Sequence, residues 1–262
     1  MANQRGTGWP PCARRPGERV QLLTIAPRFC GPPGTANGGY ASGLLAQHAR
    51  QTVRVRLVRP IPLGTPLQVA VRDGGRLELL HDDSLIASAE PAELTLEVPR
   101  PPEYLAALEA SRHYTGFNDH AFPGCFVCGP ERARGDGLRI FAGPWTPEAG
   151  GDTAGAAAQR VAAPWVPNLA LGLDDGKVRP EFMWAALDCP GYFAARADRV
   201  AMLLGEFTAH VDRRVHVEEP CVLIGWRISA SGRKYEVGTA LFDEDGELCA
   251  RARALWIEPR SS

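Results

Sequence analysis

The chain has 262 residues, of which 45% are hydrophobic and 23% are charged, a balance typical of a globular protein. Its formal net charge of −1 gives no electrostatic reason to expect nucleic acid or an anionic membrane surface as the main partner. No apolar run approaches the roughly 20 residues that a transmembrane helix needs. The seven cysteines, an odd number scattered along the chain, favour a reducing cytoplasm over a disulfide framework.

The first half predicts one helix among short strands. Residues 1–18 carry arginines but no apolar segment, so we interpret them as a flexible tail and not as a signal peptide. Residues 73–75, Asp-Gly-Gly, form a hairpin signal. The runs that predict strands are residues 19–25, 52–58, 66–72, 76–80 and 84–96.

The helix expected at residues 37–49 is apolar almost all round, which predicts that it is buried. It follows a run of glycines and prolines at 30–36 and begins with Gly38 and Gly39. Free N–H groups at a helix start can hold an oxyanion, and glycine lets a ligand approach them. The alternative is that the two glycines only permit tight packing of the helix.

The second half repeats this order of elements. Residues 99–122 are expected to be a linker with a short helix at 104–111, and residues 180–188 a second buried helix, with Pro180 at a tolerated early position. The repeat is faint in sequence and lies mainly in the order of elements. Strands are expected at residues 137–141, 159–163, 203–213, 221–230, 234–242 and 248–258.

Several motifs resemble those of hotdog thioesterases. Residues 37–40, Asn-Gly-Gly-Tyr, resemble the His-Gly-Gly or Asn-Gly-Gly helix start of hotdog acyl-CoA thioesterases, and residues 59–64 resemble the segment after that helix in double hotdogs. Residues 125–130, Cys-Phe-Val-Cys-Gly-Pro, with 137–140, resemble the start of phenylacetate-pathway-type (PaaI-like) thioesterase domains. Residues 184–190 resemble the central helix of those domains.

The resemblance covers residues 19–258 and implies an α+β fold of two tandem hotdog domains. Each domain would be a long buried helix wrapped by a curved antiparallel sheet. The domains are expected at residues 19–98 and 123–259, with the linker between them.

In PaaI-like enzymes the catalytic acid follows the residue before Gly-Gly by nine positions. Nine positions after Asn37 stands Ala46, and nine before Asp188 stands Arg179, which is followed by Pro180 and Glu181. The first helix therefore keeps the glycines without the acid, and the second keeps the acid without the glycines. Because hotdog pairs share their sites, the resemblance implies one composite site and one opposite pseudo-site that lacks both parts.

In that composite site Asp188 would act as general base on water or as nucleophile. The N–H of Gly39 or Tyr40 would stabilise the oxyanion, and Asn37 would hold the water or the thioester carbonyl. Gly38, Tyr40 and Trp184 would contact the substrate, although aromatic residues near a buried helix are more often core. Asp188 could instead be a helix C-terminal residue. A fallback acid, Glu181, is favoured at a helix start by the helix dipole alone.

Cys125 and Cys128 form a Cys-x-x-Cys pair, with His113 and His120 nearby. A structural zinc site usually needs two more ligands at short spacing, and no second such pair exists in the sequence. We therefore expect buried thiols, and no metal or cofactor.

The expected function is hydrolysis of acyl-CoA or acyl-carrier thioesters, with no nucleic acid or membrane partner. Two alternatives remain, a non-catalytic acyl-CoA-binding hotdog protein and a hotdog dehydratase or hydratase. The latter usually pairs a His with an acid, and no His precedes Gly38. Because one chain holds a hotdog pair, a monomer is viable, and exposed sheet edges make a homodimer plausible.

Overall fold

The computed structural model describes residues 20–146, 159–195 and 201–260. The expected tail, residues 1–18, lies outside this part. Within it, no helix is both long enough and apolar enough to cross a membrane.

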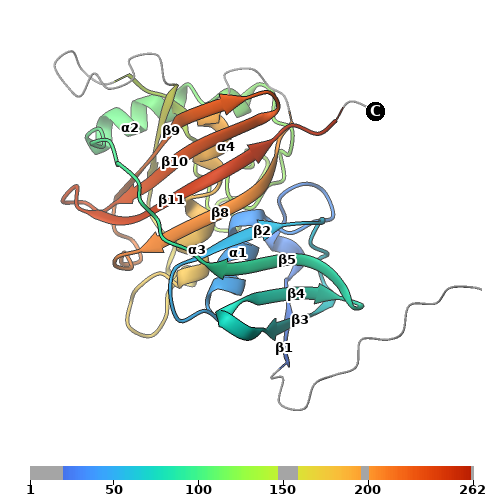
Figure 1. The fold of residues 1–262 in the computed structure, drawn as a ribbon. Helices are drawn as coiled ribbons and strands as arrows, with labels where there is room; N and C mark the ends of the chain where they lie inside the picture. Colours follow the sequence, from blue (N-terminus) through green and yellow to red (C-terminus); the bar gives the residue numbers. More distant parts are fainter. Residues whose placement is uncertain (1–19, 147–158, 196–200, 261–262) are drawn as a thin grey trace, which may run out of the picture.

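Within the described residues, eleven antiparallel strands form one sheet in the order β1-β3-β4-β5-β2-β8-β11-β10-β9-β7-β6. Figure 1 shows β2 and β8 side by side in the middle of this sheet. The first five come from the N-terminal half and the last six from the C-terminal half. Their bounds are β1 Val20–Thr24, β2 Val53–Leu57, β3 Pro66–Val71, β4 Leu77–His81, β5 Ser84–Pro91, β6 Gly143–Pro144, β7 Arg160–Trp165, β8 Leu203–Val211, β9 Cys221–Ser231, β10 Lys234–Phe242 and β11 Leu248–Ile257.

The two halves join where β2 pairs with β8. Val55 lies opposite Phe207, and both side chains are fully buried. On the other face, Nη2 of Arg56 lies 2.6 Å from Oε1 of Glu206. The alternation of β2 therefore puts apolar side chains in the core and arginines toward solvent, as its period of two predicts.

The helices are short, and two of them, α1 and α3, contact the strands at the junction. The α-helices are α1 Gly38–Ala46, α2 Tyr104–Arg112, α3 Pro180–Ala186 and α4 Cys189–Ala195, and the 3₁₀ turns are Pro27–Phe29, Asp73–Gly75, Thr115–Phe117 and Leu169–Leu171. Helices α1 and α3 pack against each other (Figure 1). The second buried helix is thus divided in two, with Leu187 and Asp188 between α3 and α4.

One segment differs from the sequence-based expectation, and another agrees with it. Residues 137–141 form no strand, and Arg139 within them has a φ of +55°, which interrupts extended backbone. The segment 99–122 contains α2, which packs on β7 with Ala107 and Ala110 buried. The domain bounds inferred from the sequence remain a prediction.

Glycines let α1 and α3 approach closely. A Cβ atom on Gly39 would lie 2.5 Å from Cβ of Asp188, and one on Gly43 would lie 2.7 Å from Cβ of Trp184 and 2.9 Å from Cα of Glu181. All three distances are too short for carbon atoms in contact, so positions 39 and 43 exclude larger side chains. The tight-packing interpretation of the glycines therefore holds, and it does not exclude a role in a site.

We predict that Gly43→Ala lowers the free energy of unfolding by about 1–3 kcal/mol, the usual cost of overpacking a core. Alanine is favoured over glycine within a helix by about 1 kcal/mol, so an overall loss reports the clash between α1 and α3. Gly124→Ala is the control, because its added Cβ would meet no atom within 4 Å. Urea unfolding measures both variants, and an unchanged or raised stability of Gly43→Ala would contradict the prediction.

Candidate functional site

Asp188 lies between α3 and α4, and its carboxylate points to the start of α1. Oδ2 accepts hydrogen bonds from the backbone N–H of Gly39, at 3.0 Å, and from Nδ2 of Asn37, at 2.8 Å. The other oxygen, Oδ1, is buried and has no hydrogen-bond partner among the described residues. Residues from the two halves, 151 positions apart, thus meet in one site.

Asn37 is the N-cap of α1 and orients the carboxylate. Its Oδ1 accepts from the N–H of Tyr40 at 2.9 Å, which is the bond expected of an N-cap side chain. This bond fixes the amide so that Nδ2 faces Asp188. Both ends of the Asn37 side chain thus have partners within the protein, because Oδ1 accepts from Tyr40 and Nδ2 donates to Asp188.

The two N–H groups that the sequence suggested for binding an oxyanion are already used in hydrogen bonds within the protein. The N–H of Gly39 donates to Asp188 and that of Tyr40 donates to Asn37, so both already have acceptors. The N–H of Gly38 has no acceptor within the described part of the chain. The remaining donor of this helix start is therefore Gly38, one position earlier than the sequence suggested.

A pocket of about 430 Å³ opens beside these groups, and Asn37, Gly38 and Asp188 line it. Two exposed arginines, Arg59 and Arg233, also border it. This volume is within the usual range for small-molecule sites, roughly 300–1,000 Å³. Both halves of the chain contribute apolar lining side chains, which include Leu57, Ile61, Tyr192, Met202, Leu204 and Trp256.

Two residues expected at the substrate lie elsewhere. Tyr40 stacks on Phe29 with ring centroids 4.2 Å apart, within an aromatic cluster of the core. Trp184 packs edge-on against Phe207, with centroids 5.5 Å apart. Neither lines the pocket. Both point away from it because a helical side chain contacts the layer that its helix packs on, which here is the core.

Burial raises the pKa of Asp188 from 3.8 to about 7, although the hydrogen bonds from Gly39 and Asn37 partly oppose this rise. The physical cause is desolvation, which disfavours a charged carboxylate. A carboxylate that titrates near neutral pH can exchange protons with a reacting group.

Three cysteines lie next to this carboxylate, and the sequence did not connect them. The sulfur atoms of Cys125, Cys128 and Cys189 are within 4.8 Å of one another, and all three residues are buried and line the pocket. Hydrogen bonds from the thiols of Cys128 and Cys189 lower the pKa of Cys125 well below its usual value. Cys189 stands 61 positions after Cys128 (189 − 128), so no local spacing signal exists.

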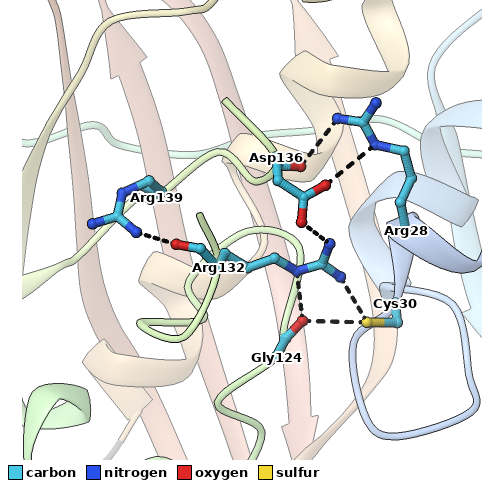
Figure 2. A network of polar contacts seen from close by, with 6 residues as sticks. All are labelled: Arg28, Cys30, Gly124, Arg132, Asp136 and Arg139. Carbon is cyan, nitrogen blue, oxygen red and sulfur yellow. Dashed lines mark hydrogen bonds and ion pairs between the residues drawn. The ribbon is translucent and has the colours of Figure 1, made fainter. Parts of the chain in front are cut away.

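A polar network holds the loop before Cys125 against the N-terminal half (Figure 2). Arg132 donates to the carbonyl of Gly124 at 2.8 Å and to Sγ of Cys30 at 2.9 Å. Asp136 accepts from the same arginine at 2.8 Å, and the carbonyl of Asp136 accepts from Arg28 at 3.0 Å. The loop that carries Cys125 is thus fixed on both sides.

Several solved structures whose folds are similar to that of this chain are named as thioesterases. A scan against protein families finds no match to the sequence, and a search of curated proteins finds none either. A tesB protein from Mycobacterium avium subsp. paratuberculosis superposes with a TM-score of 0.58 at 15% identity, over 92% of this chain and 93% of that one. An acyl-CoA thioesterase II from Mycobacterium marinum superposes with a TM-score of 0.55 at 13% identity, over 93% of this chain and 94% of that one.

A hot dog fold protein from Alicyclobacillus acidocaldarius gives a TM-score of 0.55 at 11% identity, over 95% of this chain and 96% of that one. The chain has a double hotdog fold. At these identities the likeness establishes the α+β hotdog architecture that the sequence motifs implied, and nothing finer.

At the start of α3, which is the opposite helix start of the double hotdog, Glu181 contacts side chains of the protein. Oε2 of Glu181 accepts from Nε2 of Gln47 at 2.8 Å, and Oε1 lies 3.6 Å from Nε of Arg179. Glu181 is buried at this contact. Each oxygen of the fallback acid has a partner, whereas Asp188 has both partners on Oδ2.

We predict that Asp188→Asn becomes more stable relative to the natural protein as the pH rises from 5 to 8. The pKa of Asp188 is raised in the folded natural protein. The stability that comes from its proton is therefore fully present below pH 4 and is lost as the pH rises through about 7, whereas Asp188→Asn has no such loss. The full change in the free energy of unfolding of the natural protein from this titration is on the order of 4 kcal/mol. Urea unfolding at several pH values, with a chelating agent present, measures the difference. The exposed Asp83 supplies the control, and equal pH dependence in Asp83→Asn and Asp188→Asn would contradict the prediction.

Proposed function

We propose that this protein hydrolyses acyl-CoA or acyl-carrier thioesters at one composite site, with Asp188 as general base. One observation carries the proposal: a buried carboxylate, with one oxygen that has no partner among the described residues, lines a pocket at the start of a helix from the other half. The thioesterase names of the structural neighbours support the same class of reaction.

The pocket suits an acyl thioester. Its apolar walls match an acyl chain, and the two exposed arginines at its border, Arg59 and Arg233, match the phosphates of CoA or of a phosphopantetheine arm. The reacting carbonyl would then lie near Gly38 and Asp188, where the polar lining is found.

In the proposed reaction, Oδ1 of Asp188 takes a proton from a water molecule, and the water oxygen attacks the thioester carbonyl carbon. The N–H of Gly38 and the positive end of the α1 dipole stabilise the oxyanion. When the intermediate collapses, the carbon–sulfur bond breaks, and the proton on Asp188 passes to the leaving thiolate. The products are the carboxylic acid and the free thiol.

We predict that Asp188→Asn lowers kcat/KM by about 100- to 10,000-fold, the range for loss of a general base. A panel of acyl-CoA chain lengths, with free CoA followed chromatographically, provides the measurement. Glu181→Gln is the matched control and keeps the activity, because Glu181 is engaged by Gln47 away from the pocket.

Full activity in Asp188→Asn, or no hydrolysis by the natural protein across the panel, would show that the proposal is wrong. Binding of acyl-CoA without turnover would favour the non-catalytic alternative, and hydration of an enoyl-CoA would favour a hydratase. A single turnover in ¹⁸O-labelled water distinguishes the two roles of Asp188, because only a nucleophilic carboxylate acquires the label.

Asn37 acts as a positioning residue through Asp188, and Asn37→Ser tests this role. The Ser hydroxyl can still cap α1, but the donor to Asp188 is lost. We predict a lower kcat and a shift of the acidic limb of the pH–rate profile to higher pH, because removing this donor raises the pKa of Asp188 further. A lower kcat with an unmoved limb would assign Asn37 a purely structural role.

Two further expectations remain predictions. The cysteine content favours the cytoplasm. The ends of the described sheet, β1 and β6, are the edges through which a homodimer would form, if the protein is not a monomer.

A further inference from the structure

We propose that Cys125, Cys128 and Cys189 form a binding site for a zinc ion in the wall of the pocket. The three sulfur atoms converge there from two separate segments, the loop before residue 130 and the start of α4. This site goes beyond the proposed hydrolysis and does not depend on it.

The spacing of the sulfur atoms fits tetrahedral coordination. A Zn–S bond of about 2.3 Å places neighbouring sulfur atoms of a tetrahedron about 3.8 Å apart. Sγ of Cys125 and Sγ of Cys189 are 3.8 Å apart, and the whole set lies within 4.8 Å. Small side-chain rotations therefore suffice to bring all three sulfur atoms to one ion.

The Cys-x-x-Cys loop is shaped to present both of its sulfur atoms on one side. The N–H of Gly129 donates to the carbonyl of Cys125 at 2.9 Å, which closes the loop. A Cβ on Gly129 would lie 2.4 Å from the carbonyl oxygen of Pro123, so the loop requires glycine there.

Buried thiols elsewhere in the chain behave differently. Cys221 and Cys249 are also fully buried, but each S–H donates to a nearby backbone carbonyl, of Glu219 at 3.4 Å and of Glu247 at 3.3 Å. Ordinary core cysteines are thus paired one by one with the backbone. The cluster instead turns three thiols toward one another and toward the pocket, which gives an ion a route to them.

Three protein ligands leave one tetrahedral position open, and the pocket that they line also holds polar side chains. Oδ1 of Asp188 and Nε2 of His120 are both buried, line the same pocket and have no hydrogen-bond partner among the described residues. Asp188 is 2% exposed. Binding would form three Zn–S bonds and release the proton of each thiol that is still protonated, leaving the fourth position for water or a donor from the pocket.

The test uses the full chain, purified without metal under reducing conditions, and titrates it with Co²⁺ and Zn²⁺. We expect one Co²⁺ per chain with thiolate charge-transfer absorption and tetrahedral d–d bands, displaced by Zn²⁺. Cys189→Ser should weaken binding at least about 100-fold, because loss of a ligand exceeds the 10- to 100-fold effect of losing an outer-shell partner. Cys221→Ser, at a buried thiol outside the cluster, should bind like the natural protein.

A second measurement needs no substitution. Zn²⁺ should protect the thiols of Cys125, Cys128 and Cys189 from alkylation, as located by peptide mass spectrometry, and leave the reactivity of Cys30 unchanged. Asp188→Asn retains all three thiols and should still bind Co²⁺, so a failure of the hydrolysis proposal leaves this result intact. Absence of cobalt–thiolate absorption, or protection that omits Cys189, would overturn the zinc site.

Discussion

The contact between the Asp188 carboxylate and the N–H of Gly39 constrains much of this fold. It requires α1 and α3 to approach so closely that a Cβ on Gly39 would lie 2.5 Å from Asp188. It also requires the second helix to divide into α3 and α4, because Asp188 lies at the division and turns back toward α1. Since the donor and the acceptor come from different halves, the contact exists only when both halves share one sheet through β2 and β8.

The burial of Asp188 at this contact raises the pKa of its carboxyl group, and it also lowers the stability of the fold at neutral pH. Desolvation raises the pKa of Asp188 to about 7, so its ionised form opposes folding at neutral pH. Gly39 and Asn37 offset part of this cost through hydrogen bonds to Oδ2. A purely structural residue at this position would more favourably be an uncharged amide. Retention of an acid under such conditions is typical of functional sites, where a shifted pKa is useful.

Local patterns predicted most of the elements, and the motif resemblance predicted one long-range contact. The alternation of β2 and the apolar helix after Asn37 lie within short windows, and their physical causes are local. The motif resemblance also placed Asp188 opposite Gly39. Sequence could not show that Tyr40 and Trp184 turn into the core, because side-chain direction depends on which layer each helix contacts. It likewise missed Cys189, whose partners are set by the tertiary fold and not by spacing.

The two helix starts of the double hotdog differ in how their polar groups are satisfied. At the start of α3, each carboxylate oxygen of Glu181 has a partner, from Gln47 and Arg179. At the start of α1, the N–H of Gly38 and Oδ1 of Asp188 lack partners among the described residues, and both line the pocket. A buried polar group without a partner costs about 1–3 kcal/mol. The polar groups at one end of the helix pair are therefore satisfied within the protein. At the other end a donor and an acceptor line the pocket, where a water molecule or a substrate can bind to them.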